Sequence, residues 1–123
     1  MVVVDASAFA AVIFSEEHGA RVLEQIANAD SLTAPAILPF ELANTARTKI
    51  RQRPSDAATL RENLAEALER GIVLRPVDFV AVVELALETN LSASDASYLW
   101  LARHLRVRLI TLDKKLAAHA ETF

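Results

Sequence analysis

The sequence predicts an α/β fold built on a parallel β-sheet, and three observations point to it. Residues 2–4 form an apolar, β-branched run that ends in the carboxylate of Asp5, and a similar run over 108–112 ends in Asp113. Continuous apolar runs of this length are typical of strands buried on both faces. Between these two runs, short strand-like segments alternate with longer amphipathic ones, which is the pattern of parallel strands joined by right-handed helical crossovers.

The first half of the chain is expected to alternate in this way from residue 1 to residue 51. A strand over 1–5 leads into an apolar helix over 6–14. Ser15, followed by two glutamates, is a candidate N-cap for a second helix. The inward face of that helix is expected to carry Val22, Leu23, Ile26 and Ala27. A strand over 31–34 stops at Pro35, and a helix over 36–51 tolerates Pro39 in its first turn.

The second half continues the alternation after a break at 54–56. An amphipathic helix follows and ends at Gly71, a usual C-terminal stop. Its inward positions are Ala57, Leu60, Leu64 and Leu68. A strand over 72–74 precedes a helix that Asp78 caps and that runs to about Thr89. The helix over 92–106 is apolar nearly all round and is therefore expected to be central; a strand over 108–112 and a helix from Lys114 complete the chain.

Composition limits the classes of protein that the chain can belong to. Its 123 residues predict a single domain, 1–123, with 53% hydrophobic residues to fill a core. The absence of cysteine excludes disulfides, thiolate catalysis and zinc–thiolate sites. We expect neither a membrane span nor a secretory signal, and hence a cytoplasmic protein without a membrane partner. The net charge of −3 argues mildly against nucleic-acid binding, unless the acids surround divalent metals.

Four acids stand out, because each lies in an apolar context or at the edge of a predicted element: Asp5, Glu41, Asp95 and Asp113. Crowded carboxylates raise one another's pKa unless cations balance them. Oxygen ligands without histidine or cysteine suit Mg²⁺ or Mn²⁺, and water at such an ion can attack a phosphodiester. The four acids therefore predict a metal-dependent phosphodiesterase site, to which Ser7 is placed to add a hydroxyl.

Each of these residues also has a purely structural interpretation, and both interpretations stay open at this point. Asp113 is placed to cap the last helix, and Asp95 to pair with a cap at Ser92. Ser7 is placed to cap the first helix, and Glu41 to face solvent, as most glutamates do. Asp5 is the hardest to explain structurally, because a carboxylate that ends a buried strand needs partners.

The segments 2–8, 39–44, 91–99 and 109–116 resemble the PIN-domain nucleases, in the right order and over essentially the whole chain. Within that family the sequence is most similar to the VapC toxins of bacterial toxin–antitoxin pairs. The resemblance implies a Rossmann-like, three-layer α/β/α sandwich and an endoribonuclease that hydrolyses RNA with water activated by Mg²⁺ or Mn²⁺. One departure is Ser94, where relatives often carry an aromatic residue; it bears on RNA stacking or packing rather than on metal binding.

The resemblance also implies roles for residues and partners. Asp5, Glu41, Asp95 and Asp113 match the catalytic, metal-binding quartet, with Glu41 completing the site or orienting the attacking water. Ser7 and Thr111 match hydroxyl positions that line the same pocket. The family further implies a homodimer and a small antitoxin, in a VapBC-type pair, whose tail occupies an apolar groove.

Basic residues near the acids allow two interpretations. Arg47, Lys49 and Arg51 lie at the end of the Glu41 helix, where cations are favoured by the helix dipole. Their continuity with a polar stripe from Glu41 also makes them candidates for RNA binding, and Lys114 and Lys115 are candidates because they lie beside Asp113.

Two other classes of protein compete with the nuclease. A catalytically silent module would use the same fold and acids to bind a metal or a partner. A phospho-receiver domain would carry a phospho-accepting aspartate at the end of a middle strand. Here the corresponding strand, 72–74, is followed by three further residues before Asp78, and Asp113 stands where such a domain has a lysine.

Overall fold

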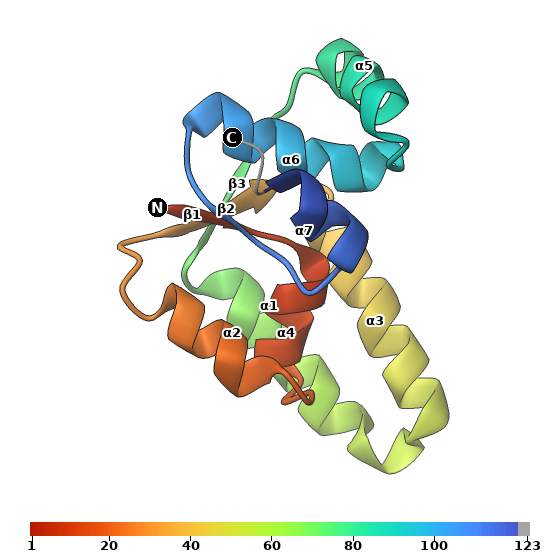
Figure 1. Cartoon of the computed structure of the whole chain (residues 1–123). Coiled ribbons are helices and arrows are strands. Elements are labelled where there is room, and N and C mark those ends of the chain that lie inside the picture. Colours follow the sequence, from red (N-terminus) through yellow and green to blue (C-terminus); the bar gives the residue numbers. More distant parts are fainter. Residues whose placement is uncertain (121–123) are drawn as a thin grey trace.

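The computed structural model describes residues 1–120 and has a four-stranded sheet at its centre (Figure 1). All neighbouring strands pair in parallel, in the order β3-β2-β1-β4. The strands are β1 (Val2–Val4), β2 (Leu32–Pro35), β3 (Ile72–Arg75) and β4 (Leu109–Ile110). The last three residues of the predicted domain, 121–123, lie outside the described part of the chain.

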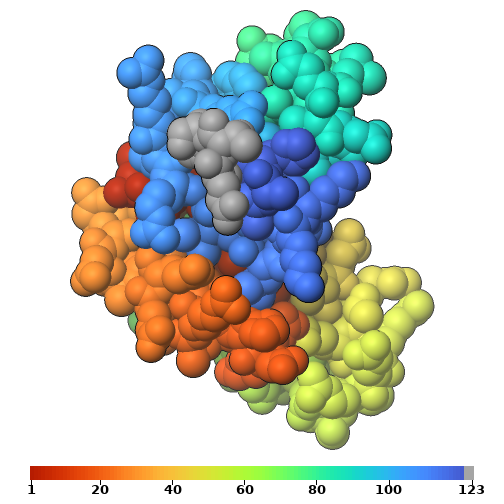
Figure 2. Space-filling model, viewed as in Figure 1, coloured from red at the N-terminus to blue at the C-terminus, as the bar shows by residue number. Residues whose placement is uncertain are grey.

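Helices cover both faces of this sheet, as predicted. They are α1 (Ala6–Ile13), α2 (Gly19–Ile26), α3 (Leu38–Gln52), α4 (Ala57–Glu69), α5 (Phe79–Thr89), α6 (Ala93–Leu105) and α7 (Lys114–Ala120), with a short 3-10 turn η1 (Pro54–Asp56). Helix α6 packs across β1, β2 and β4 on one face, whereas α1, α2 and α4 lie on the other (Figure 1). The end at which α3 and α4 are joined projects to one side of the body, in yellow and yellow-green at the lower right of Figures 1 and 2. In the described residues, no helix has the length and apolar character needed to cross a membrane.

Strand β1 occupies the interior of the sheet, which confirms the buried strand expected from its composition. Val3 and Val4 are fully buried, and they pair with β4 on one side while β2 flanks the other. Because the strands are parallel, their carboxyl ends meet at one edge of the sheet. The residues after β1, β2 and β4 therefore enter the same region, and this edge is where ligand sites of open α/β sheets lie.

The start of α2 differs from the prediction. Ser15 ends α1 rather than capping α2: its φ is 52°, and the amide of Glu16 donates to the carbonyl of Ala11 at 2.9 Å in a Schellman-type closure. Helix α2 begins four residues later, at Gly19, which packs so closely on α1 that an added Cβ would lie 2.3 Å from the carbonyl oxygen of Ala11. Serine is common at both ends of helices, and only the packing of α2 on α1 decided between them.

Three smaller expectations also need correction. Leu23 and Leu68 were assigned to inward faces, yet their side chains are 53% and 38% exposed. Helix α2 buries only Gly19 and Val22, and α4 buries only Leu60, so the apolar side chains beside them stay partly or largely exposed. Pro35 is the last residue of β2 and pairs with Arg75, rather than standing outside the strand.

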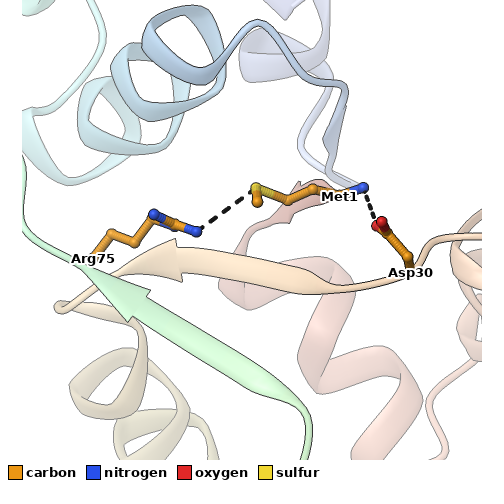
Figure 3. Close-up of polar contacts among 3 residues, drawn as sticks. All are labelled: Met1, Asp30 and Arg75. Carbon is orange, nitrogen blue, oxygen red and sulfur yellow. Dashed lines mark hydrogen bonds and ion pairs between the residues drawn. The ribbon is translucent and has the colours of Figure 1, made fainter.

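The amino-terminal part of the sheet is held by contacts that converge on Met1. Its amino group lies 2.5 Å from Asp30, and the guanidinium group of Arg75 approaches its sulfur at 3.9 Å (Figure 3). Arg75 also donates to the hydroxyl of buried Thr33 at 2.9 Å, so its side chain crosses from β3 over β2. These contacts link three of the four strands.

Candidate metal centre at the carboxyl edge of the sheet

Asp5 follows β1 directly and is buried, with 4% of its surface exposed. It is the N-cap of α1, and its Oδ1 accepts from the amide of Ala8 at 2.9 Å and from the hydroxyl of Ser7 at 2.7 Å. Its Oδ2 accepts from the hydroxyl of Thr111 at 2.5 Å. Burial raises the pKa of Asp5 more than these three hydrogen bonds lower it, and the negative charge of Asp95 adds to the rise.

Ser7 and Thr111 form a hydroxyl frame around Asp5. The Ser7 hydroxyl accepts from the amide of Leu112 at 3.1 Å, and the Thr111 hydroxyl accepts from the amide of Asp113 at 3.0 Å. The two hydroxyl oxygens lie 3.5 Å apart. Residues 104 positions apart in the chain therefore fix one carboxylate, and the segment after β4 is tied to the end of β1.

Glu41 lies in the first turn of α3 and is half-buried. Its Oε1 accepts a 2.5 Å hydrogen bond from the hydroxyl of Tyr98 on α6. Burial raises the pKa of Glu41, and the negative charges of Asp95 and Asp5 raise it further, against the hydrogen bond from Tyr98. The same surroundings raise the pKa of Tyr98, so the phenol is the donor in this contact.

Asp95 lies in the first turn of α6, and its amide donates to the hydroxyl of Ser92 at 3.1 Å. The predicted cap at Ser92 is therefore present. This cap uses the backbone of Asp95, while its side-chain charge acts on both Asp5 and Glu41. The structural and the functional interpretation of Asp95 are thus compatible.

Asp113 stands apart from the other three acids. It is exposed, and its Oδ1 accepts from the amide of Leu116 at 2.9 Å, which makes it the cap of α7. Its link to Asp5 is indirect and runs through the hydroxyl of Thr111, which accepts from its amide. The structure thus confirms the predicted helix cap, and a role of Asp113 as a metal ligand stays a prediction.

The donor set at this edge fits a hard divalent cation. Asp5, Glu41 and Asp95 offer only oxygen ligands, which is the preference of Mg²⁺ and Mn²⁺. Among residues 1–120, none of these three carboxylates has an ion-pair partner. A bound cation would offset the burial, and the smaller repulsion between the acids, that raise the pKa of Asp5 and Glu41. In the described part of the chain, no three acids or histidines are already drawn together as ligands of one ion.

A groove of about 460 Å³ begins beside Ser7 and Glu41 and includes Asn44, Thr45 and a second carboxylate, Glu16. A second hollow, which shares Asn44 and Thr45, continues along α3 past Thr48. The polar stripe that the sequence placed next to Glu41 therefore lines a continuous surface that leads away from the acids.

Two of the five candidate RNA-binding residues already contact other groups. The ammonium group of Lys49 lies 2.6 Å from the Glu16 carboxylate, and that of Lys115 donates to the backbone carbonyl of Asn90 at 2.7 Å. The other three, Arg47, Arg51 and Lys114, are exposed.

The structure argues against a phospho-receiver domain. The strand expected to carry the phospho-accepting aspartate, β3, lies at the edge of the sheet rather than in its middle. Asp78 accepts from the amide of Ala81 at 3.1 Å and caps α5, as its position in the sequence predicts.

The fold and its acids define a class: an α/β protein with a parallel sheet that has the buried carboxylate of Asp5 directly after an interior strand. The sequence profile of the PIN domain matches residues 2–121, and the chain belongs to the PIN-domain family. This confirms the resemblance found in the four sequence segments.

Relatives cover nearly the whole chain. It is 30% identical to Ribonuclease VapC3 of Pyrobaculum aerophilum, over 94% of this chain and 91% of the relative. It is 31% identical to VapC ribonuclease Mb0985 of Mycobacterium bovis, over 95% and 89%. The crystal structure of PAE2754 from Pyrobaculum aerophilum matches with a TM-score of 0.79 and 25% identity, over 98% of this chain and 84% of that one. The three-layer fold is thereby confirmed.

Sequence reasoning missed Tyr98. The residue lies within the segment 91–99 that carries the family resemblance, but no role was assigned to it. A signal was present, because Tyr98 follows Asp95 by three positions and therefore lies on the same face of α6.

Proposed function

We propose that this chain is an endoribonuclease that depends on Mg²⁺ or Mn²⁺, the toxin component of a VapBC-type pair. The observation that carries the proposal is that Asp5, Glu41 and Asp95 lie near enough at one sheet edge for the charge of Asp95 to act on the other two, while none of the three has an ion-pair partner in residues 1–120. Relatives named as VapC ribonucleases support it over nearly the full length of the chain.

The roles proposed for the residues are those that the family resemblance implies. Asp5, Asp95 and Asp113 would hold the principal ion, and Glu41 would complete the site or orient the attacking water. When bound, the ion supplies Lewis acidity and lowers the pKa of water. In the hydrolysis, the water oxygen bonds to phosphorus while one ester oxygen leaves. Ser7 and Thr111 keep the Asp5 carboxylate in place, because each donates a hydrogen bond to a different one of its oxygens.

RNA is proposed to follow the groove along α3. The amide of Asn44, the hydroxyl of Thr45 and the carboxylate of Glu16 line this groove. The exposed guanidinium groups of Arg47 and Arg51 lie on the same helix. Lys114 adds a third exposed cation beside Asp113. Lys49 and Lys115 remain candidates, although each would have to give up its present contact to meet a phosphate.

Cleavage of labelled RNA by the purified protein tests the proposed activity. We expect cleavage with Mg²⁺ or Mn²⁺, none with EDTA, and none by Asp5→Asn. Asp78→Asn is the matched control, since it neutralises an exposed aspartate that caps a helix outside the site, and it should cleave as well as the wild type. Cleavage by Asp5→Asn at the wild-type rate, unaffected by EDTA, would disprove the proposal. Metal-dependent stabilisation without cleavage of any RNA would instead favour the catalytically silent module.

We also propose a homodimer and a small antitoxin as partners. An apolar surface on α5 and the start of α3 supports the dimer: Phe40, Phe79, Val80 and Leu87 are between 71% and 76% exposed. Patches of this kind mark interaction sites on soluble proteins. Light scattering of the purified chain should give the dimer mass, and Leu87→Glu should give the monomer. Co-expression with a small protein encoded beside this chain tests the antitoxin, through co-purification and loss of cleavage.

A further inference from the structure

Tyr98 joins the two helices that carry Glu41 and Asp95. It lies one turn after Asp95 on α6, and its side chain is almost fully buried, with 1% exposed. Its hydroxyl donates to Oε1 of Glu41 on α3 at 2.5 Å, across 57 positions of sequence. A single side chain thus connects two of the acids of the proposed site.

The support for Glu41 is sparser than that for Asp5. Three donors hold the Asp5 carboxylate. Within residues 1–120, Tyr98 provides the one hydrogen bond to the Glu41 carboxylate. A glutamate side chain has three rotatable bonds, so without a partner its carboxylate is spread over several rotamers. The bond from Tyr98 selects one of them and leaves Oε2 to meet a ligand.

We propose that Tyr98 is a positioning residue that orients the Glu41 carboxylate for metal and water. The expected effect on catalysis rests on the proposed function. The hydrogen bond between Tyr98 and Glu41 does not depend on that function. Tyr98 acts through Glu41 and does not touch RNA. Mutation of residues that orient metal ligands in this way typically lowers metal affinity or activity by about 10–100-fold. We expect an effect of this order for Tyr98.

Tyr98→Phe is the direct test, because phenylalanine keeps the buried ring and removes only the hydroxyl. The change should lower stability only slightly, because a single hydrogen bond is lost. Thr33→Val is the control: it removes another hydroxyl that is 1% exposed, one that donates to the carbonyl of Val73 and accepts from Arg75 and contacts none of the acids of the proposed site. We expect Tyr98→Phe to lower kcat, or to raise the Mg²⁺ concentration for half-maximal activity, by roughly 10–100-fold. Thr33→Val should change neither.

A double-mutant cycle with Glu41→Gln shows whether Tyr98 acts through Glu41. If it does, Tyr98→Phe has little further effect once Glu41 is changed. Equal fold-losses in both backgrounds would overturn the inference. Wild-type activity in Tyr98→Phe, with Glu41→Gln impaired, would overturn it while leaving the proposed function intact. An inactive wild type would count against the proposed function instead.

A second measurement needs neither activity nor a variant of Tyr98. Tyr98 is the one tyrosine of the chain, so growth on 3-fluorotyrosine gives a protein with a single ¹⁹F label, at this position. We expect titration with Mg²⁺ to shift this resonance in the otherwise unaltered protein and to leave it in place in Glu41→Gln. An identical shift in both proteins, or a shift in neither, would contradict the proposed link between Tyr98, Glu41 and the metal.

Discussion

Replacing Asp5 by asparagine separates the cost of burying this carboxylate from its benefit in binding metal. Asparagine has the same shape and is as good an N-cap as aspartate. Its oxygen can accept from Ser7 and Ala8, and its amide can donate to the hydroxyl of Thr111. The substitution therefore removes the negative charge and preserves the hydrogen-bonding frame.

The direction of the stability change follows from the balance at this site. Hydrogen bonds to a charged group contribute about 1.5–3 kcal/mol each, and burial of an ion costs several kcal/mol. The pKa of Asp5 is raised, so burial outweighs the three hydrogen bonds. Without metal at pH 7, we therefore expect Asp5→Asn to be at least as stable as the wild type.

Adding metal should make the wild type more stable than Asp5→Asn. A ligand at 100 times its Kd stabilises the folded state by about 2.7 kcal/mol. For a chain of this length that amounts to about 10 °C in Tm. The wild type should gain this increment with Mg²⁺ or Mn²⁺, whereas Asp5→Asn should gain little.

The pH dependence of the metal-free proteins adds a second check. The folded-state pKa of Asp5 lies above its unfolded value of 3.8, so between the two values the folded protein binds more protons than the unfolded chain. The free energy of unfolding therefore falls as the pH rises through this window. Glu41 contributes in the same direction in both proteins. The fall should thus be smaller in Asp5→Asn than in the wild type.

Urea unfolding monitored by circular dichroism, with and without Mg²⁺, measures all of these quantities. The reasoning is refuted if metal-free Asp5→Asn is destabilised by more than about 2 kcal/mol, a loss at the upper limit for a helix cap. An equal gain from metal in both proteins would refute the assignment of Asp5 as a ligand.

Three other changes test separate parts of the molecule. Gly19→Ala should lower stability by about 1–3 kcal/mol, because its Cβ would lie 2.3 Å from the carbonyl oxygen of Ala11; an unchanged Tm would contradict the close packing of α2 on α1. Asp113→Asn should keep its cap on α7 and its Tm but lose activity, and full activity in a cleavage assay would remove it from the site. Arg51→Gln should weaken RNA binding and reduce its salt dependence without changing Tm, whereas Lys49→Gln should lower Tm because it removes an ion pair. Filter binding and thermal melts measure these effects, and the reverse result would exchange the roles of the two residues.

Local sequence signals predicted most of the elements correctly. The apolar run at 2–4 is buried on both faces as β1, and Asp78 and Ser92 cap α5 and α6. These signals succeed because a cap or a buried strand depends on a few neighbouring residues. Ser15 was assigned wrongly, because the same residue type can end one helix or begin the next.

The candidate site also divides into features that the sequence predicted and features that only the structure revealed. The sequence by itself determined the family, the alternation of strands and helices, and the candidate acids, because residue types at fixed spacing carry that information. The tertiary structure alone decided that Tyr98 meets Glu41 and that Lys49 meets Glu16. Each of these pairs joins elements far apart in the chain. Such contacts depend on the order of the strands and the packing of the helices, which no local pattern encodes.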